Sequence, residues 1–459
     1  MRLYNTLSRK IEEFAPLNPP NVGVYACGPT VYDYTHIGHL RKYVGDDILR
    51  RVLEASGYKV KHVMNITDVG HLVSDEDSGE DKMEKGARES NRTVWEVAKF
   101  YEDYFWESVQ TVNIERPNIV AKATEHIKEQ IKLIEKLEKN GFIYITDHAI
   151  YFDISKFPDY TKLSGQKLED KETSRQDVFI DLQKKNPQDF ALWFFTVGHF
   201  KDHSMRWPSP YGEGFPGWHI ECSAMSMEYL GDSFDIHTGG IDHIPVHHTN
   251  EIAQSEAATG KMFVKYWVHH NFLIVDSEKM SKSKKNFYRI EEVLEKGFEP
   301  IALRYLFLTA HYRDKLNFTW ESLGAAENAL NNLKEEIRNW EEPEEKTGEY
   351  YQKFLEVLNN DLNTPQAIAV LWEMVKSDNP TSAKAKTILE MDKILGLGLQ
   401  EYLGKKLEVP EEVMKLVHKR EQARGKGYFK ESDKLRKQIK KLGFEVEDTP
   451  NGPRLKTIA

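Results

Sequence analysis

One strand-loop-helix unit near the N-terminus constrains the fold more than any other stretch of the sequence. Residues 22–26 form a short apolar run with β propensity, and Gly28-Pro29 interrupts it. Apolar residues then recur at helical spacing from Leu40 onward, and His36 and His39 stand just before them. The pattern predicts a strand, a loop and a helix, with both histidines at the start of the helix.

The start of a helix suits an anionic ligand. Its first backbone N–H groups lack intrahelical partners and form the positive end of the helix dipole. Two imidazoles at this place can donate hydrogen bonds to phosphoryl oxygens as charge develops on them. On local sequence alone, two polar histidines that cap a helix are the simpler interpretation.

A second motif, Lys279-Met280-Ser281-Lys282-Ser283, follows the apolar residues 272–275. By itself such a run is typical of a solvated loop. Its two ammonium groups also suit a clamp that stabilises the charge of a triphosphate during transfer. Together with His36-Ile-Gly-His39, the run resembles the two signature motifs of class I aminoacyl-tRNA synthetases. The resemblance implies that His36, His39, Lys279 and Lys282 are catalytic.

Length and charge limit the possible organisation. A chain of 459 residues is too long for one hydrophobic core, so two or more domains are expected. The sequence has no apolar signal core and no apolar run of membrane-spanning length, which predicts a cytoplasmic protein with no membrane contact. The net charge is −10, yet residues 405–459 carry 15 Lys and Arg against 9 Asp and Glu. Such a basic end is expected to meet a phosphate backbone.

The chain has only two cysteines, Cys27 and Cys222, which excludes a disulfide scaffold. The ordinary interpretation of each is a buried small hydrophobic residue. However, both lie in polar surroundings, and downstream His247 and Glu251 share a face if their segment is helical. Two thiolates, an imidazole and a carboxylate suit tetrahedral zinc, although no Cys-x-x-Cys pair supports the idea.

Several blocks in the same order resemble the cysteinyl-tRNA synthetase family along essentially the whole chain. Besides the two signature motifs, they are Tyr25-Ala-Cys-Gly-Pro-Thr-Val-Tyr-Asp33, Asn65-Ile-Thr-Asp68, Trp207-Pro-Ser-Pro210, Gly217-Trp-His-Ile-Glu-Cys-Ser-Ala-Met225, His237-Thr-Gly-Gly-Ile-Asp242 and His247-His-Thr-Asn-Glu-Ile-Ala-Gln254. The resemblance implies one zinc ion per chain, held by Cys27, Cys222, His247 and Glu251. Zinc binds a thiolate far better than a hydroxyl, so it would separate cysteine from serine without an editing domain.

The resemblance also implies the ligand contacts. The residues expected to bind ATP with Mg²⁺ are Thr30, His36, Gly38, His39, Gly239, Gly240, Lys279, Met280, Ser281, Lys282 and Ser283. The residues expected to bind L-cysteine are Cys27, Thr67, Trp218, His237 and Asp242. The paired glycines after a strand permit close approach of adenosine. On local sequence they are equally consistent with a simple tight turn.

The expected architecture is α/β. It begins with a Rossmann-like, doubly wound parallel sheet with an insertion, and continues with an α-helical bundle and a small C-terminal anticodon-binding domain. The expected segments are 1–113 and 190–275 for the two catalytic halves, 114–189 for the insertion, 276–319 for the module of the second signature motif, 320–404 for the bundle and 405–459 for the C-terminal domain.

The C-terminal segment is predicted to bind tRNA(Cys). Basic and aromatic side chains suited to phosphates and splayed bases line a predicted helix pair, and the expected contacts are Arg420, Arg424, Tyr428 and Arg436. A solvated helix surface would show similar charges. Two stretches depart from the family pattern: Lys284-Lys285-Asn286, where many members have Leu-Gly-Asn, and the acidic residues after Asp68.

The predicted function is that of a cysteine–tRNA ligase, a monomer that activates cysteine with ATP and transfers it to tRNA. One alternative is a ligase that joins activated cysteine to a small amine, and another is a catalytically silent tRNA-binding paralogue. A nicotinamide-dependent oxidoreductase would need a Gly-x-Gly-x-x-Gly turn, which the sequence lacks.

Overall fold

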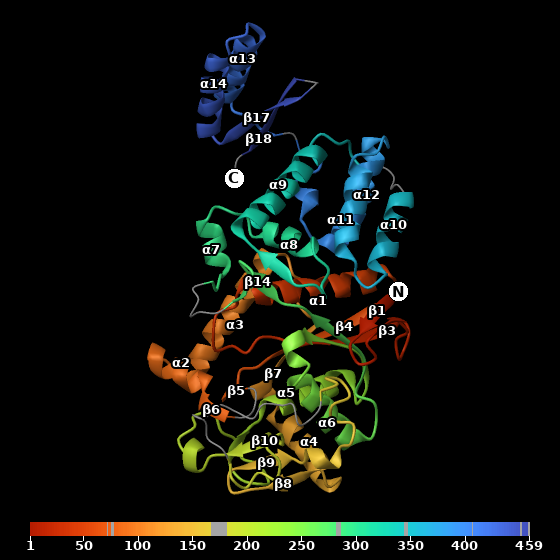
Figure 1. The fold of residues 1–459 in the computed structure, drawn as a ribbon, viewed down its shortest axis with the longest axis vertical. Coiled ribbons are helices and arrows are strands. Elements are labelled where there is room, and N and C mark those ends of the chain that lie inside the picture. The colour runs from red at the N-terminus through yellow and green to blue at the C-terminus, as the bar shows by residue number, and fades with distance from the viewer. Residues whose placement is uncertain are drawn as a thin grey trace. The chain divides into compact units, whose positions relative to one another are not determined.

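The computed structural model describes residues 1–70, 72–74, 78–166, 181–280, 286–343, 348–405, 407–449 and 452–457 (Figure 1). The chain divides into two compact units. The first contains Met1–Arg289, Phe307–Phe318 and Leu355–Ala367, and the second contains Ile290–Leu306, Thr319–Phe354 and Ile368–Ala459. In the described ranges, no helix combines the length and the apolar character needed to span a bilayer.

A five-stranded parallel sheet organises the first unit. Its strands, in spatial order, are β13 (Val264–His270), β12 (Phe234–Gly240), β3 (Asn21–Ala26), β4 (Lys59–Ile66) and β7 (Ile119–Lys122). The chain winds outward from β3 in one direction and from β12 in the other, so the point between them is a topological switch point, where ligands of such sheets bind. The expected doubly wound α/β sheet is confirmed.

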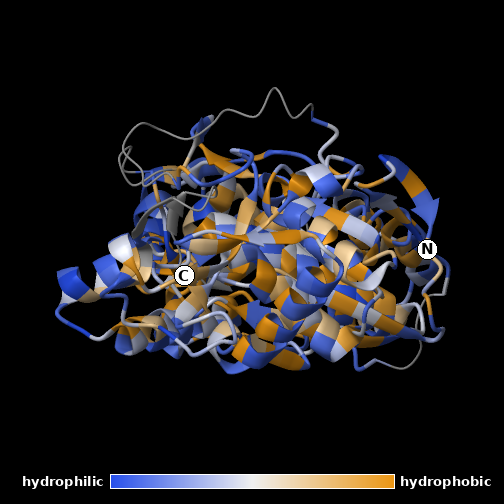
Figure 2. Cartoon of the chain, turned by 90° about the horizontal axis from the view of Figure 1, so that it is seen from below, coloured by the Kyte–Doolittle hydropathy of each residue, from blue (hydrophilic) through white to orange (hydrophobic). Residues whose placement is uncertain are grey.

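Helix α1 (Ile37–Ala55) connects β3 to β4, as the apolar spacing after Leu40 predicted. The other helices of this unit whose bounds fall before residue 260 are α2 (Lys82–Ser90), α3 (Val94–Thr111), α4 (Ile127–Lys139), α5 (Trp218–Leu230) and α6 (His247–Thr259). Figure 2 shows polar and apolar residues alternating around many of the helices, which is the pattern of helices that bury one face.

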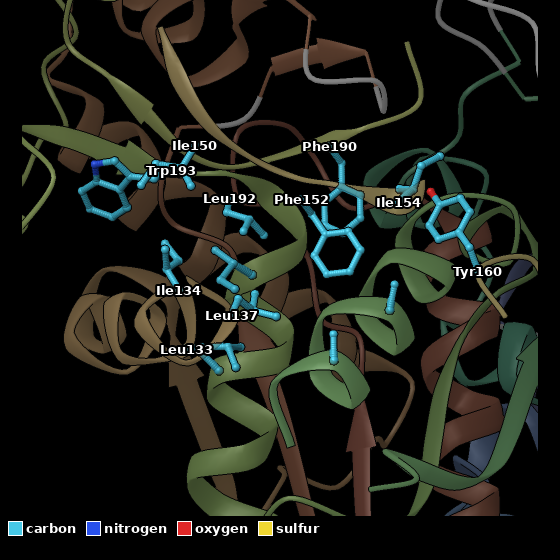
Figure 3. Close-up of a cluster of buried hydrophobic side chains, with 14 of the residues drawn as sticks. Leu133, Ile134, Leu137, Ile150, Phe152, Ile154, Tyr160, Phe190, Leu192 and Trp193 are labelled. Atoms are coloured by element: carbon cyan, nitrogen blue, oxygen red, sulfur yellow. The ribbon is translucent and has the colours of Figure 1, made fainter. Parts of the chain in front are cut away.

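A four-stranded antiparallel sheet forms the insertion. Its strands, in spatial order, are β11 (Gly214–Pro216), β10 (Phe190–Phe195), β9 (Ala149–Phe152) and β8 (Ile143–Ile145). Side chains of α4 pack on those of β9 and β10, as Leu137, Phe152 and Leu192 show in Figure 3. The boundary expected at 189/190 falls inside this sheet, because β10 pairs with β9 and not with the parallel strands.

Small hairpins complete the first unit. Strands β1 (Arg2–Asn5) and β2 (Lys10–Glu13) pair with each other. Strands β5 (Leu72–Ser74) and β6 (Ser78–Asp81) pair in the acidic stretch that resembled a loop in the sequence. A three-stranded sheet follows the parallel sheet, with β14 (Leu273–Val275) between β15 (Glu278–Lys279) and β16 (Leu316–Phe318).

A buried guanidinium fastens α1 to the chain around β14. Arg41 is 5% exposed and donates hydrogen bonds to four backbone carbonyl oxygens. They belong to Asn271 and Phe272, at 3.1 and 2.7 Å, and to His311 and Asp314, at 3.2 and 2.6 Å. This residue therefore fixes the first signature motif relative to the strand that leads to the second.

The helices after residue 289 are α7 (Ile290–Glu295), α8 (Ile301–Leu308), α9 (Trp320–Ile337), α10 (Gly348–Leu358), α11 (Thr364–Val375) and α12 (Thr381–Leu395). Helix α9 buries Leu323, Ala326, Leu330, Leu333 and Ile337, the apolar seam that the sequence predicted. Its first turn is closed by Thr319 and Ser322, whose side chains reciprocally cap each other's backbone N–H groups.

The C-terminal segment contains the predicted helix pair, α13 (Glu411–Gly425) and α14 (Phe429–Lys441). A hairpin of β17 (Phe444–Thr449) and β18 (Gly452–Thr457) follows them. Val413 and Val417 of α13, Ile439 of α14, and Phe444 and Val446 of β17 form its core.

A buried histidine on β4 makes the stability of the first unit sensitive to acid. His62 is 3% exposed and neither ring nitrogen makes a hydrogen bond. Burial lowers its pKa to about 4, against about 6.5 in an unfolded chain. Below pH 6.5 the unfolded chain gains a proton at this position that the folded chain does not bind.

We therefore expect His62 to reduce the free energy of unfolding as the pH falls from 6.5 to 4. The reduction should reach about 3 kcal/mol at pH 4. A His62→Leu variant should lose less stability over this range than the unmodified chain, as measured by urea unfolding at several pH values. The exposed His199→Leu serves as the control and should keep the original slope. An unchanged slope in His62→Leu would contradict the assignment.

Candidate active site and metal centre

Four potential metal ligands meet at the carboxyl ends of the parallel strands. Cys27 follows β3, Cys222 lies on α5, and His247 and Glu251 stand one turn apart on α6. One ligand atom from each lies within 4.8 Å of all the others, and all four residues are buried. The structure thus brings together the four residues that the sequence suggested as zinc ligands.

The hydrogen bonds around the four residues fit a bound cation. His247 Nδ1 lies 2.9 Å from His219 Nδ1, which leaves His247 Nε2 directed toward the cluster. Nε2 lies 3.1 Å from Glu251 Oε1, yet this buried oxygen makes no hydrogen bond. The other oxygen, Oε2, lies 3.1 Å from His237 Nε2. A nitrogen and an oxygen that face each other with no hydrogen bond between them, beside two sulfur atoms, form a donor set for a divalent metal.

A second combination of residues meets the same distance condition. Cys27, His237, His248 and Glu251 also offer ligand atoms within 4.8 Å of one another. His248 Nε2 lies 3.2 Å from the Cys27 sulfur, and its Nδ1 lies 2.7 Å from His269 Nε2. His248 and His237, which do not belong to the first set, therefore lie at hydrogen-bond distance from Cys27 and Glu251, respectively.

The two thiols are electrostatically unequal. Burial raises the pKa of Cys27, but the hydrogen bond with Cys222 and the nearby His248 together lower it well below its ordinary value. The hydrogen bond with Cys27, followed by burial, raises the pKa of Cys222. The favoured state has one thiolate and one thiol, so binding of a cation to both sulfurs would release a proton.

A cavity of about 430 Å³ opens beside this cluster, and Cys27 forms part of its wall. Eight of the residues that the sequence analysis assigned to ATP or cysteine line it: Cys27, Thr30, His36, Gly38, His39, Gly240, Asp242 and Met280. The cavity therefore joins the sulfur cluster to the first signature motif.

Four other predicted residues lie behind the cavity wall. Thr67 is 1% exposed and accepts a hydrogen bond from Asn65. Trp218 stacks on the imidazole of His247, with ring centroids 4.2 Å apart, and His237 contacts Glu251. At Gly239 a Cβ would come within 2.4 Å of the His248 ring, so glycine there permits the close packing of that imidazole.

The two histidines of the first motif stack on each other at the start of α1. Their ring centroids are 3.7 Å apart, and His36 Nδ1 accepts a hydrogen bond of 3.0 Å from Gly38 N. Burial and then the neighbouring His39 lower the pKa of His36, and desolvation lowers the pKa of His39, although that ring faces the open cavity. A neutral pair at the start of a helix offers ring nitrogens to a phosphate without repulsion between two charged rings.

Gly38 explains how the second motif approaches the first. A Cβ at this position would lie 2.4 Å from Met280 Cε and 2.8 Å from the His36 ring. Glycine at this position lets the Met280 methyl group and the His36 ring approach the start of the helix closely. The backbone of Lys279 lies in β15, and Ser281, Lys282 and Ser283, like Lys284 and Lys285, lie outside the described residues.

The C-terminal candidates differ in their surroundings. Arg420 is 1% exposed and forms two hydrogen bonds with the Asp448 carboxylate, at 2.8 and 2.9 Å. It joins α13 to β17 inside this segment, so the structure does not support it as a phosphate ligand. Arg424 and Arg436 are exposed, and Tyr428 is 59% exposed. Arg424 Nη1 lies 3.1 Å from Asp448 Oδ2, and Arg436 Nη2 donates a hydrogen bond of 2.7 Å to Val446 O.

Sequence reasoning missed three residues of the site: Lys42, His243 and His248. Two of them adjoin predicted residues, because His243 follows Asp242 and His248 follows His247. Lys42 lies three positions after His39 on α1, so the helical period places both on one face. Burial lowers the pKa of His243, but the nearby Cys27 raises it by more. The net result is a pKa of about 9.

The fold and the site define a class I aminoacyl-tRNA synthetase. Residues 13–328 match the family model described as the tRNA synthetases class I (C) catalytic domain, and residues 353–400 match the DALR domain. Among solved structures, a methionyl-tRNA synthetase of Mycobacterium tuberculosis with bound methionyl-adenylate has a TM-score of 0.56 at 15% identity, covering 82% of this chain and 90% of the other. A leucyl enzyme–tRNA complex of Agrobacterium radiobacter has a TM-score of 0.59 at 12% identity, with 85% of both chains covered. At these identities the two structures support the fold alone.

Relatives with higher sequence identity show to which family within this class the chain belongs. The chain is 47% identical to cysteine–tRNA ligase 1 of Burkholderia lata over 456 residues, which cover 99% of this chain and 96% of the relative. It is 45% identical to the cysteine–tRNA ligase of Treponema denticola, with 98% of both chains covered. The chain belongs to the cysteine–tRNA ligase family, as the order of its motifs suggested. This membership also removes the oxidoreductase alternative.

The cluster of Cys27, Cys222, His247 and Glu251 can be tested by changing one ligand atom. A Cys222→Ser variant replaces sulfur by oxygen, a much poorer ligand for a borderline-soft metal. We expect purified Cys222→Ser to hold clearly less metal per chain than the unmodified protein, as measured by mass spectrometry of the elements. Ser226→Ala, one turn further along α5, is the control and should keep full metal content. Full metal content in Cys222→Ser would contradict the ligand assignment.

Proposed function

We propose that the chain attaches L-cysteine to tRNA(Cys) in two steps. ATP first activates the cysteine carboxylate with release of pyrophosphate, and the 3′-terminal adenosine of the tRNA then accepts the cysteinyl group. The observation that carries this proposal is one cavity lined by His36, His39 and Cys27, which also belongs to the cluster with Cys222, His247 and Glu251. One end suits a thiol, and the other suits a triphosphate.

We infer that the metal is zinc, with Cys27, Cys222, His247 and Glu251 as its ligands. Two sulfur atoms, one imidazole and one carboxylate are a donor set that zinc favours over harder ions. When bound, zinc would take the substrate sulfur as a further ligand and reject the hydroxyl of serine. Trp218, stacked on His247, and His219, bonded to it, hold that ligand's ring in place.

The first step relies on positioning and electrostatics. The positive end of the α1 dipole, with His36 and His39, stabilises charge on the α-phosphate as the carboxylate attacks it. Lys279 and Lys282 neutralise the departing pyrophosphate, and Mg²⁺ accompanies the ATP. Thr30 and Gly240, which line the cavity, contact the nucleotide. No covalent intermediate with a side chain is required.

The C-terminal segment is proposed to bind the tRNA. Exposed Arg424 and Arg436 suit phosphates, and the side chains of Tyr428 and Phe429, 59% and 63% exposed, suit unstacked bases. These exposed rings favour tRNA over a small amine as the acceptor. The monomeric state and the cytoplasmic location expected from the sequence stay predictions.

The test is cysteine-dependent exchange of pyrophosphate into ATP, followed by charging of tRNA(Cys). We expect exchange with cysteine and very little with serine at equal concentration, and charging in proportion to added tRNA. Exchange without charging, with a small amine accepting cysteine instead, would point to the alternative ligase. Absence of exchange would identify a silent paralogue.

One variant tests the assigned role of the first motif. His39→Asn should slow pyrophosphate exchange about 10²- to 10³-fold, because it removes a group that stabilises the transition state. Its affinity for cysteine, measured by calorimetry without ATP, should stay unchanged, since His39 does not contact the metal cluster. The exposed His199→Asn is the matched control. Equal losses of cysteine affinity and exchange in His39→Asn would contradict this role.

A further inference from the structure

A lysine that the proposed mechanism does not use lies in the wall of the cavity. Lys42 stands on α1 one turn after His39, and its side chain is 13% exposed. Its Nζ donates a hydrogen bond of 2.5 Å to the backbone carbonyl of Cys27. Among the described residues that line the cavity, Lys42 is the only lysine or arginine.

The ammonium group is held from behind by a buried network. Asp46, one turn further along α1, is 3% exposed, and its Oδ2 lies 2.7 Å from Lys42 Nζ. Its other oxygen lies 3.0 Å from His270 Nε2. Gly45 leaves room for the His270 ring, because a Cβ there would come within 2.3 Å of it. Three residues from α1 and β13 are thus arranged behind the Lys42 side chain.

The charge of this network is well defined. Burial would raise the pKa of Asp46, but the Lys42 ammonium and the hydrogen bond with His270 lower it well below its usual range. Asp46 is therefore a carboxylate at neutral pH. Its contact with Lys42 Nζ holds the lysine side chain in the cavity wall.

Lys42 lies where the carboxylate of a bound amino acid is expected. An amino acid whose thiol lies at the metal cluster and whose carboxylate attacks a phosphate at His36 and His39 must hold that carboxylate between the two centres. Lys42 contacts Cys27 at one end of this path and lies three residues from His39 at the other. An ammonium has three N–H donors. One of them goes to the Cys27 carbonyl, and the Asp46 carboxylate lies 2.7 Å from the same nitrogen, which leaves a donor for the substrate.

We propose that Lys42 donates a hydrogen bond to the α-carboxylate of the substrate cysteine and holds it for attack on ATP. This assignment rests on the proposed function and adds a substrate contact to the same site. The remaining charges are complementary, since the carboxylates of Asp33 and Asp242 also line the cavity and suit the amino group of the substrate. The ammonium group would also offset the repulsion between the carboxylate and the triphosphate as they approach.

The test compares two ligands that differ by the carboxylate. Cysteamine keeps the thiol and the amino group of cysteine but has no carboxylate. We expect Lys42→Met to weaken cysteine binding about 10- to 100-fold, the usual effect of losing a hydrogen bond between charged groups. Cysteamine affinity should stay unchanged. Both are measured by calorimetry on the metal-loaded protein, with metal content determined for each variant.

Two further variants keep the test decisive. Lys42→Met leaves Asp46 buried without its ammonium partner, so the double variant Lys42→Met with Asp46→Asn removes both charges and should show the same difference between ligands. Lys265→Met is the matched control, because Lys265 Nζ also donates to a backbone carbonyl, that of Ala15, but lies outside the cavity lining. It should bind both ligands normally.

The outcomes separate this assignment from the function on which it rests. Equal weakening of cysteine and cysteamine in both Lys42 variants would show that Lys42 acts through Cys27, and it would overturn the assignment. Unchanged binding of both ligands would overturn it as well. Failure of the unmodified, metal-loaded protein to bind either ligand would instead count against the proposed function.

Discussion

The site depends on the parallel pairing of two strands that are about two hundred residues apart in the chain. Tyr25 of β3 is in register with His237 of β12, and Cys27 N donates a hydrogen bond of 3.1 Å to Thr238 O. This pairing sets the first cysteine beside the residues that follow β12. Because β3 and β12 lie on either side of the switch point, the loops after them diverge and leave space for a ligand.

The helices after these strands supply the two kinds of chemistry. Helix α1 follows β3 and presents its N-terminus and two histidines, whereas α6 follows β12 and presents an imidazole and a carboxylate on one face. The two sulfur atoms come from other places, since Cys27 follows β3 and Cys222 lies on α5. Cys27 belongs to the cluster, and its backbone carbonyl accepts a hydrogen bond from Lys42 of α1, which links the cluster to the helix of the histidine pair.

Much of this arrangement could be predicted from the sequence, because its signals are local. The run at 22–26, the periodicity after Leu40 and the spacing of His247 and Glu251 each specify one element. Two features could not be predicted. The apolar residues of β10 fit a parallel or an antiparallel strand equally well, so only the pairing with β9 assigns them to the insertion. Arg420 looked like a surface cation, since nothing local indicates that Asp448 would bury it.

The guanidinium of Arg41 has a mechanical consequence. Because it ties α1 to the carbonyls just before β14, the histidine pair and the start of that strand keep a fixed spacing. The place of Met280 against Gly38 is then set by the two-residue turn after β14. That turn holds Asp276 and Ser277 at φ values of 47° and 67°, in a left-handed geometry for which hairpins normally employ glycine. Two side chains other than glycine in this geometry determine the direction in which β15 leads the chain back toward the helix.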